Sequence, residues 1–433
     1  MNTSRIVCTL ILIGTLLSVP ATAQQQIVDR HAEPFEHVEQ LALMLDEIGP
    51  ERLVLLGESS HGTSEFYSWR AAISKWLIQE KGFQFIAVEG DWPAMARINE
   101  YIKQKENAPA SLEAALATLD RWPLWMWRNE EVKELVEWLY EYNMDRAQEE
   151  KVGFYGIDLY GKRLGMEQVV QFLENRDPDG AEQAERAYSC LTRFDDVRNY
   201  IQMVAQFGDD CSQDMQQVLT SVQEMDGFDA AEWGWFTTKQ NAKMVIRAEE
   251  HFRGNLERGA ASWNTRATHF YETVQRLMAF YGDGSRGVVW AHNTHIGDAR
   301  ATDMQRQGAV NIGQLAREDL GREQVFAIGF GTYTGTVLAA REWEGTMQVM
   351  ETPPARSDSW EAMLAATGHE QAFINLKRER VRDALRMPIQ HRAIGVTFQP
   401  EMEAHNYVDT VLPERYDAFI FIRNTSTLQP LDL

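Results

Sequence analysis

Four short apolar stretches, each followed at once by an acidic residue or a histidine, constrain the fold of this chain more than any other feature. They cover residues 52–57, 83–88, 152–157 and 287–291. Their length and continuous apolar character are typical of strands buried on both faces of a sheet. The residues that follow them are Glu58, Glu89, Asp158 and His292. A core strand needs no titratable group at its end, so the repetition indicates a functional site.

A helical pattern separates the first two stretches. Phe66, Trp69, Ile73 and Trp76 are spaced to form one buried helix face, and Gly82 is typical of the residue that follows a helix. Strand, helix and strand over roughly 35 residues make a βαβ unit. We therefore expect the first two strands to be parallel neighbours in the sheet.

Further strands are predicted at residues 325–330, 393–398 and 418–422, whereas residues 165–284 are charged and lack strand-like runs. The chain is thus predicted to have an α/β fold, with a largely parallel central sheet flanked by helices. The catalytic core would comprise residues 24–164 and 285–433. Residues 165–284 would form a helical insertion or side domain.

The N-terminus has the pattern of a cleaved secretory signal. Arg5 precedes an apolar run over residues 6–19 that is too short for a membrane span, and residues 21–23 form a small-residue cleavage site. We expect a signal peptide over residues 1–23 and a soluble, periplasmic or secreted mature protein. That compartment permits a disulfide between Cys190 and Cys211, with two unpaired thiols as the equal alternative.

The charge of the chain bounds its partners. Its 64 acidic and 42 basic residues give a formal net charge of −22. Such a chain repels phosphate backbones and anionic lipids, which argues against nucleic acid or a membrane surface as partner. We expect a small-molecule partner instead.

The turn over residues 57–62 joins a strand to a helix and carries Glu58 and His61. An imidazole titrates near neutrality, so His61 could act as a general base. It would need a partner to hold one tautomer, and Glu89 on the neighbouring strand could be that partner. Alternatively, Glu58 and His61 are loop residues that cap the following helix.

Arg70 and a histidine pair extend the candidate site. Arg70 lies at the margin of the buried helix face, where it could orient a carboxylate, stabilise an oxyanion or remain solvated. His292 and His295 could bind a metal together with Glu58 and Glu89. They could instead hydrogen-bond a water and a carbonyl, or only satisfy hydrogen bonds within the core. Ligands of open parallel sheets bind beyond the carboxyl ends of the strands, so we expect these side chains to converge.

Two other features suggest alternatives. Ser59 and Ser60 suggest a serine hydrolase, but the nucleophile elbow needs a glycine where His61 stands. Tryptophans at residues 122–127 and 233–235 could line a site for a bulky, partly apolar ligand, with core packing as the alternative. The candidate substrate-binding residues are Asp158, Trp125, Trp127 and Arg128.

Together these residues resemble the erythromycin esterase family over almost the whole mature chain. The family's G-E-x-x-H turn is matched by residues 57–61, and its arginine nine residues later by Arg70. Its strand-end glutamate is matched by Glu89 and its H-x-x-H pair by His292 and His295. Further blocks that resemble family members lie at residues 125–129, 156–160, 297–302 and 311–315.

The resemblance implies hydrolysis of macrolides or other lactones and esters, as in antibiotic resistance, without an obligatory metal or other cofactor. It implies that His61 activates water and that Glu89 holds the His61 ring in place. Glu58, Arg70, His292 and His295 would orient the water and stabilise the tetrahedral intermediate. Two alternatives stay open: a metal-dependent hydrolase that uses the same side chains, and a non-catalytic exported protein that binds glycans or macrolides through its tryptophans.

Overall fold

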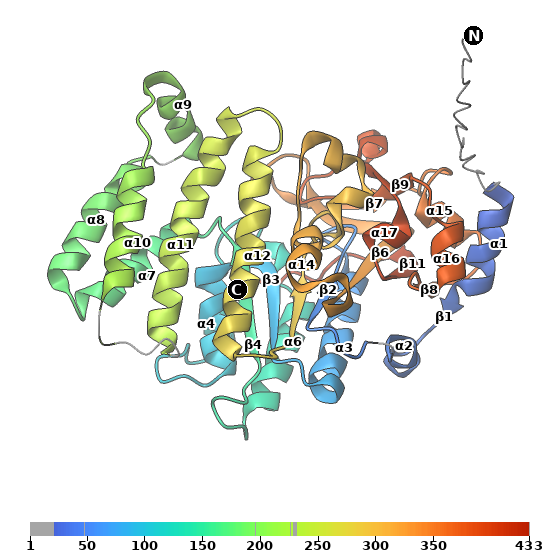
Figure 1. Ribbon diagram of the computed structural model, residues 1–433, viewed down its shortest axis with the longest axis horizontal. Helices are drawn as coiled ribbons and strands as arrows, with labels where there is room; N and C mark the ends of the chain where they lie inside the picture. The colour runs from blue at the N-terminus through green and yellow to red at the C-terminus, as the bar shows by residue number, and fades with distance from the viewer. Residues whose placement is uncertain (1–20, 47, 195, 226, 228–231, 433) are drawn as a thin grey trace, which may run out of the picture.

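The computed structural model describes residues 21–46, 48–194, 196–225, 227 and 232–432. Its centre is a nine-stranded sheet in the order β1-β8-β11-β6-β2-β5-β3-β4, with β7 paired to β6 (Figure 1). These strands are β1 (Glu33–Pro34), β2 (Leu53–Leu56), β3 (Phe85–Asp91), β4 (Gly153–Asp158), β5 (Gly287–Trp290), β6 (Val325–Ala340), β7 (Met347–Thr352), β8 (Gln371–Asn375) and β11 (Ala418–Thr425). A separate antiparallel pair consists of β9 (Ile389–Arg392) and β10 (Tyr407–Thr410).

The middle of the sheet is parallel. β2 pairs with β5 and β6, β3 with β4 and β5, and β11 with β6, all in parallel. β1, β7 and β8 form the antiparallel pairs. Every residue of β2, β3, β4 and β5 is buried, as the continuous apolar runs predict. The protein thus has the predicted α/β fold with a mixed, mostly parallel central sheet.

Two details of the predicted sheet are wrong. β2 and β3 are not neighbours, because β5 lies between them and pairs with both. Residues 393–398 form no strand, because their hydrogen bonds go to separate places. Ile394 bonds the turn after β2 through Ser59, whereas Val396 and Phe398 bond the end of β6 at Ala340.

Helices cover both faces of the sheet, and alternating strand residues serve the two resulting cores. Val54 and Leu56 of β2 point into one core, and Leu53 and Leu55 into the other. The first core is closed by α2 (Val38–Leu45), α3 (Ser64–Lys81), α4 (Trp92–Ile102), α5 (Leu112–Leu116) and α6 (Glu130–Asn143). The second is closed by α1 (Ala21–His31), α12 (Ala261–Tyr281), α14 (Ile312–Leu320), α15 (Trp360–Ala365), α16 (Glu379–Ala384) and α17 (Leu412–Arg415).

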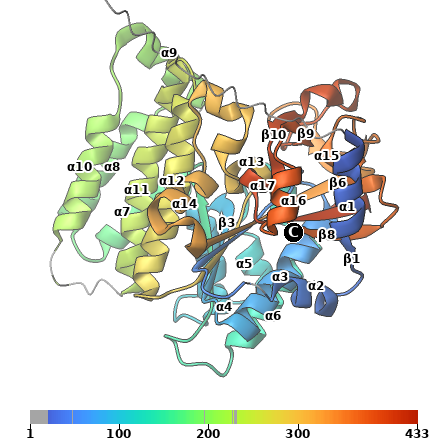
Figure 2. The same ribbon diagram turned by 45° about the vertical axis from the view of Figure 1, so that its right-hand side comes forward.

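Between β4 and β5, the described residues form helices and no strand. They are α7 (Lys162–Glu174), α8 (Pro178–Thr192), α9 (Val197–Phe207), α10 (Ser212–Glu224), α11 (Trp233–Arg253), the short 3-10 turn η2 (Gly254–Leu256) and α12. Helices α7 to α11 surround an apolar core of their own and extend from one end of the sheet (Figures 1 and 2). An extra helical region is therefore present, and α12 leads from it back onto the sheet.

Cys190 in α8 and Cys211 before α10 form the disulfide that the sequence left open. The predicted signal peptide lies largely outside the described residues, and its predicted cleavage site falls in the first turn of α1. No helix of the described residues is long and apolar enough to cross a membrane.

We predict that replacing Cys190 and Cys211 together by Ser destabilises the helical region by about 3 kcal/mol, because the bridge restricts the unfolded chain. Urea unfolding followed by circular dichroism measures this loss. Reductant should destabilise the wild-type protein by a similar amount and leave the double variant unchanged. A double variant as stable as the wild type would contradict the prediction.

Candidate active site

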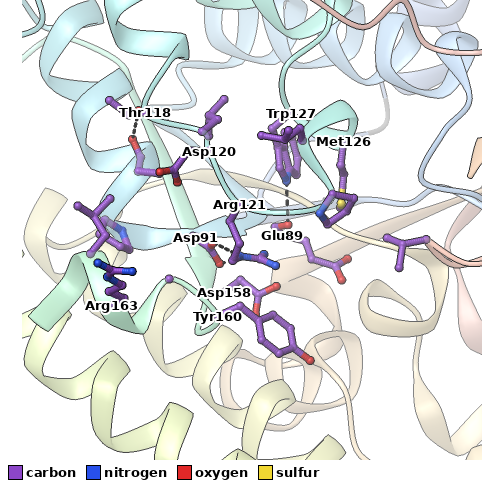
Figure 3. A pocket seen from close by; sticks show the side chains of 18 of the residues that line it. Glu89, Asp91, Thr118, Asp120, Arg121, Met126, Trp127, Asp158, Tyr160 and Arg163 are labelled. Atoms are coloured by element: carbon purple, nitrogen blue, oxygen red, sulfur yellow. Dashed lines mark hydrogen bonds and ion pairs between the residues drawn. The ribbon is translucent and has the colours of Figure 1, made fainter. Parts of the chain in front are cut away.

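The carboxyl ends of β2, β5, β3 and β4 lie side by side at one edge of the sheet. Glu58, His292, Glu89 and Asp158 stand at these ends, and all four are buried. The structure thus brings the predicted strand-end residues together, and Figure 3 shows Glu89 and Asp158 at the cavity that they border.

His61 is held by Glu58 rather than by Glu89. Nδ1 of His61 lies 2.8 Å from Oε1 of Glu58, and Nη2 of Arg70 donates to Oε2 of Glu58 at 2.6 Å. The predicted partner was wrong because Glu58 is three residues before His61 in the same turn and reaches the ring directly. Burial lowers the pKa of His61, but the hydrogen bond and charge of Glu58, with the charge of Glu89, outweigh it and raise the pKa.

Arg70 lies behind Glu58, not beside a substrate. It is fully buried, and its guanidinium carbon lies 4.3 Å from the centre of the Tyr67 ring and 4.8 Å from that of Trp290. Its charge therefore acts on His61 through Glu58. Of the three sequence-based roles for Arg70, this position fits the orientation of a carboxylate, that of Glu58, and not a solvated residue or a direct contact to an oxyanion.

His292 is placed by the cap of the short helix α13 (Asn293–Ile296). Nδ1 of His292 accepts the backbone N–H of Thr294 at 3.3 Å and lies 2.7 Å from the Thr294 hydroxyl. Because Nδ1 is the acceptor, the proton of the neutral ring is on Nε2. Burial and the nearby His61 hold the pKa of His292 well below its usual range.

His292 therefore presents a neutral ring with a free donor. Its Nε2 is buried and has no hydrogen-bond partner among the residues that the structure describes. The ring centres of His61 and His292 are 4.9 Å apart. The site thus combines an imidazole held by a carboxylate with an adjacent N–H group that can bind developing negative charge.

Glu89 is surrounded by donors. Its Oε2 accepts the backbone N–H of His292 at 2.9 Å, and its Oε1 accepts Nη2 of Arg266 at 2.9 Å. Nε2 of His295 lies 3.4 Å from the same oxygen. Burial raises the pKa of Glu89, but His295 and Arg266 outweigh it and hold the pKa well below its ordinary value. Glu89 is therefore a buried carboxylate that anchors the loop after β5.

Arg266 of α12 completes the site, and the sequence analysis missed it. Its Nε and Nη2 bind the two carboxylate oxygens of Asp158 at 2.9 and 2.5 Å, and its Nη1 lies 3.3 Å from Nε2 of His295. One turn earlier in α12, Trp263 stacks on the His295 ring with centres 4.5 Å apart. The available signal was electrostatic: two carboxylates at buried strand ends require a cation.

Two cavities meet at these side chains. The larger has a volume of about 550 Å³ and the smaller about 390 Å³, and both are lined by His61, Glu89, Arg266, Trp343 and Val396. His292 and His295 line the smaller one. Figure 3 shows the larger cavity, where Arg121 faces Asp91 in an ion pair beside Asp158 and Tyr160.

Of the four predicted substrate-binding residues, two line a cavity and two do not. Asp158 and Trp127 line the larger cavity, and Nε1 of Trp127 donates to the backbone oxygen of Glu89 at 3.1 Å. Trp125 and Arg128 are not among the described residues that line either cavity, so their part in substrate binding stays a prediction. Trp125 lies in the 3-10 turn η1 (Leu124–Met126), where successive side chains diverge, and it packs into the first core.

Neither serine of the turn lines a cavity: Ser59 and Ser60 are buried, and the Ser60 hydroxyl contacts that of Thr63. Within the described ranges, no group of three or more His, Cys, Asp or Glu residues is arranged to hold a metal ion.

Comparison with known proteins identifies the family. The sequence model described as erythromycin esterase matches residues 78–425. The chain belongs to the erythromycin esterase family. A Bacillus subtilis (strain 168) protein named "Putative hydrolase YbfO" is 21% identical over 92% of this chain and 90% of its own length. The Escherichia coli "Erythromycin esterase type II" is 26% identical over 40% of this chain and 41% of its own length.

Solved structures show the same fold. A crystal structure described as a succinoglycan biosynthesis protein has a TM-score of 0.77 at 21% identity and covers 95% of this chain and 98% of its own. A mutant of the erythromycin esterase EreC in its open conformation has a TM-score of 0.66 at 16% identity and covers 92% of this chain and 97% of its own.

We predict that the pKa of His61 lies above the ordinary histidine value and that the pKa of His292 lies well below it. Replacing Glu58 by Gln removes the charge that stabilises the imidazolium, so the pKa of His61 should fall. NMR titration of the histidine ring protons measures both. Glu65→Gln is the matched control, because Glu65 lies on α3 and bonds Ser426 instead. An unchanged His61 titration in the Glu58 variant would contradict the assignment.

Proposed function

We propose that this member of the family is a carboxylic-ester or lactone hydrolase in which His61 activates a water molecule. The proposal rests on two adjacent imidazoles at the junction of the cavities that differ in their hydrogen bonding. His61 is bound to Glu58 through Nδ1, whereas His292 is neutral and offers Nε2–H.

In the proposed reaction, Nε2 of His61 takes a proton from water as the water oxygen attacks the ester carbonyl carbon. The carbonyl electron pair moves to its oxygen, and the Nε2–H of His292 stabilises that oxyanion. The intermediate collapses with cleavage of the carbon–oxygen ester bond, and the leaving alkoxide takes the proton from the His61 imidazolium. The products are a carboxylic acid and an alcohol, or a hydroxy acid from a lactone.

The neighbouring charges support this cycle through the groups that they hold in place. Glu58 stabilises the imidazolium that forms at His61, and Arg70 neutralises Glu58 in the buried turn. Glu89 and Arg266 fix the loop that carries His292, through the backbone N–H of that residue. These groups therefore contribute orientation and electrostatic preorganisation.

The substrate is proposed at a coarser level. The name of the Escherichia coli relative favours a macrolide or similar ester, and family membership favours ester hydrolysis in general. The pattern of residues 1–23 favours an exported enzyme that meets its substrate outside the cytoplasm.

We predict that His61→Asn lowers kcat for ester hydrolysis by about 10²–10⁴-fold, the usual contribution of a general base. The measurement is a panel of esters and lactones that includes macrolides, with products identified by the mass of one added water. His369→Asn is the matched control, because this histidine precedes β8 and lies outside the lining of both cavities. A folded His61→Asn protein with normal turnover would contradict the proposal.

The pH profile follows from the same assignment. A base acts only when deprotonated, so kcat/KM should fall as the pH drops through the raised pKa of His61, above 6.5. In Glu58→Gln this acidic limb should move to lower pH. An acidic limb that stays in place would indicate that another group is the base.

We further expect hydrolysis to survive chelation. Activity measured after dialysis against EDTA should equal that of untreated protein. Loss of activity that added Zn²⁺ restores would favour the metal-dependent alternative over water activation by His61.

A further inference from the structure

Trp343 stands where the two cavities join. Among the described residues, five line both cavities, and three of them are the polar residues His61, Glu89 and Arg266. The other two are Trp343 and Val396. Trp343 therefore borders a substrate whose ester bond lies beside His61, whichever cavity holds the rest of that substrate.

Trp343 is unusually exposed for so large an apolar side chain. It lies between β6 and β7 and is 54% exposed, and Leu124, which also lines the larger cavity, is 41% exposed. Leaving apolar area in water costs free energy, so exposed large apolar side chains that gather at a cavity mark a binding surface.

Two aromatic contacts and a hydrogen bond to its loop fix the position of Trp343. The rings of Trp122 and Trp343 meet edge to face with centres 4.7 Å apart, and the centre of the Tyr160 ring lies 6.0 Å from that of Trp343. Nε1 of Trp122 donates to the backbone oxygen of Gly345 at 3.0 Å, which ties the same loop to the segment before η1. The indole is thus held at the cavity instead of folding into the core, as a preorganised contact requires.

We propose that Trp343 contacts the substrate and that the two cavities are separate subsites for the two halves of one ester. This inference rests on the proposed function and names the substrate class: a bipartite ester whose bulkier half is an apolar ring system without anionic groups. That half occupies the larger cavity against Trp343, Leu124 and Pro123, all of which line it.

The charges of the larger cavity argue against an anionic ring. Its carboxylates are largely neutralised by ion pairs, with Asp91 bound to Arg121 and Asp158 to Arg266. The lining holds five carboxylates against three arginines, a formal surplus of two negative charges with His61 neutral (3 − 5 = −2). An anionic substituent would meet net repulsion there.

The smaller cavity suits the other half of the ester, because its volume is about 390 Å³ against about 550 Å³ for the larger one. A compact group fits it better than a second ring system.

The test compares matched esters on the wild-type protein and Trp343→Ala. Each pair has a small ester and one carrying an alicyclic ring, placed on the acyl side in one series and on the alcohol side in another. Trp343→Ala should lower kcat/KM for ring-bearing esters of at least one series by about 10–200-fold, the usual range for lost apolar contacts in a pocket. The small esters should change by no more than about two-fold.

Controls separate contact from folding. Trp343→Phe keeps an aromatic face and should retain most of the preference for ring-bearing esters. Met347→Ala is the matched surface control, because Met347 is 44% exposed at the start of β7 and is absent from the described lining of both cavities. Adding a carboxylate to the ring should lower the kcat/KM of the wild-type protein. A gain would overturn the exclusion of anionic groups from the larger cavity.

The outcomes distinguish the two proposals. Wild-type protein that hydrolyses no ester of the panel overturns the proposed function and, with it, the subsites. Hydrolysis with the same ratio of ring-bearing to small esters in Trp343→Ala overturns the role of Trp343 alone. An equal loss for both kinds of ester has the same consequence, because it would reflect damage to the catalytic groups.

Discussion

Burial of charge at one edge of the sheet is the constraint on which the rest of the site depends. Glu58 is paired with Arg70, and Glu89 and Asp158 share Arg266, all with little or no access to water. A buried carboxylate without a partner would be protonated or would destabilise the fold by several kcal/mol. His295 and Arg266 hold the pKa of Glu89 below its ordinary value, and Arg266 does the same for Asp158, whereas Arg70 pairs with Glu58. The two arginines come from helices α3 and α12. The helices therefore have to pack where they do for the site to exist.

The order of the strands then decides which groups meet. Because β5 lies between β2 and β3, the loop after β5 is held from both sides. Asn293 donates its backbone N–H to the Glu58 backbone oxygen at 2.8 Å, and His292 donates its own to the Glu89 carboxylate at 2.9 Å. Glu89, across β5 from β2, acts on His61 through its charge, whereas Glu58 in the same turn takes the hydrogen bond of the ring.

What the sequence could predict is what local pattern determines. Apolar runs and the polar residues that end them located β2, β3, β4 and β5, and the carboxyl-edge rule gathered Glu58, His61, Glu89 and His292 before any coordinates. Arg266 and Trp343 have no such local signal, since one is a helix arginine and the other a loop tryptophan. Their importance lies in contacts with elements distant in sequence. The same holds for residues 393–398, whose apolar pattern is that of a strand although their partners are scattered.

The different roles of the two central imidazoles depend on a small local feature, the cap of α13. Thr294 donates to Nδ1 of His292 through its backbone N–H, and its hydroxyl is close enough to bond the same atom. This leaves the proton on Nε2, on the side where no described residue accepts it. Glu58 does the opposite at His61, because a carboxylate at Nδ1 accepts a hydrogen bond from Nδ1–H and leaves Nε2 with a lone pair. One ring is therefore prepared to receive a proton and the other to donate a hydrogen bond. Two residues of one chemical type thus take complementary parts, because their Nδ1 atoms face an acceptor in one case and donors in the other.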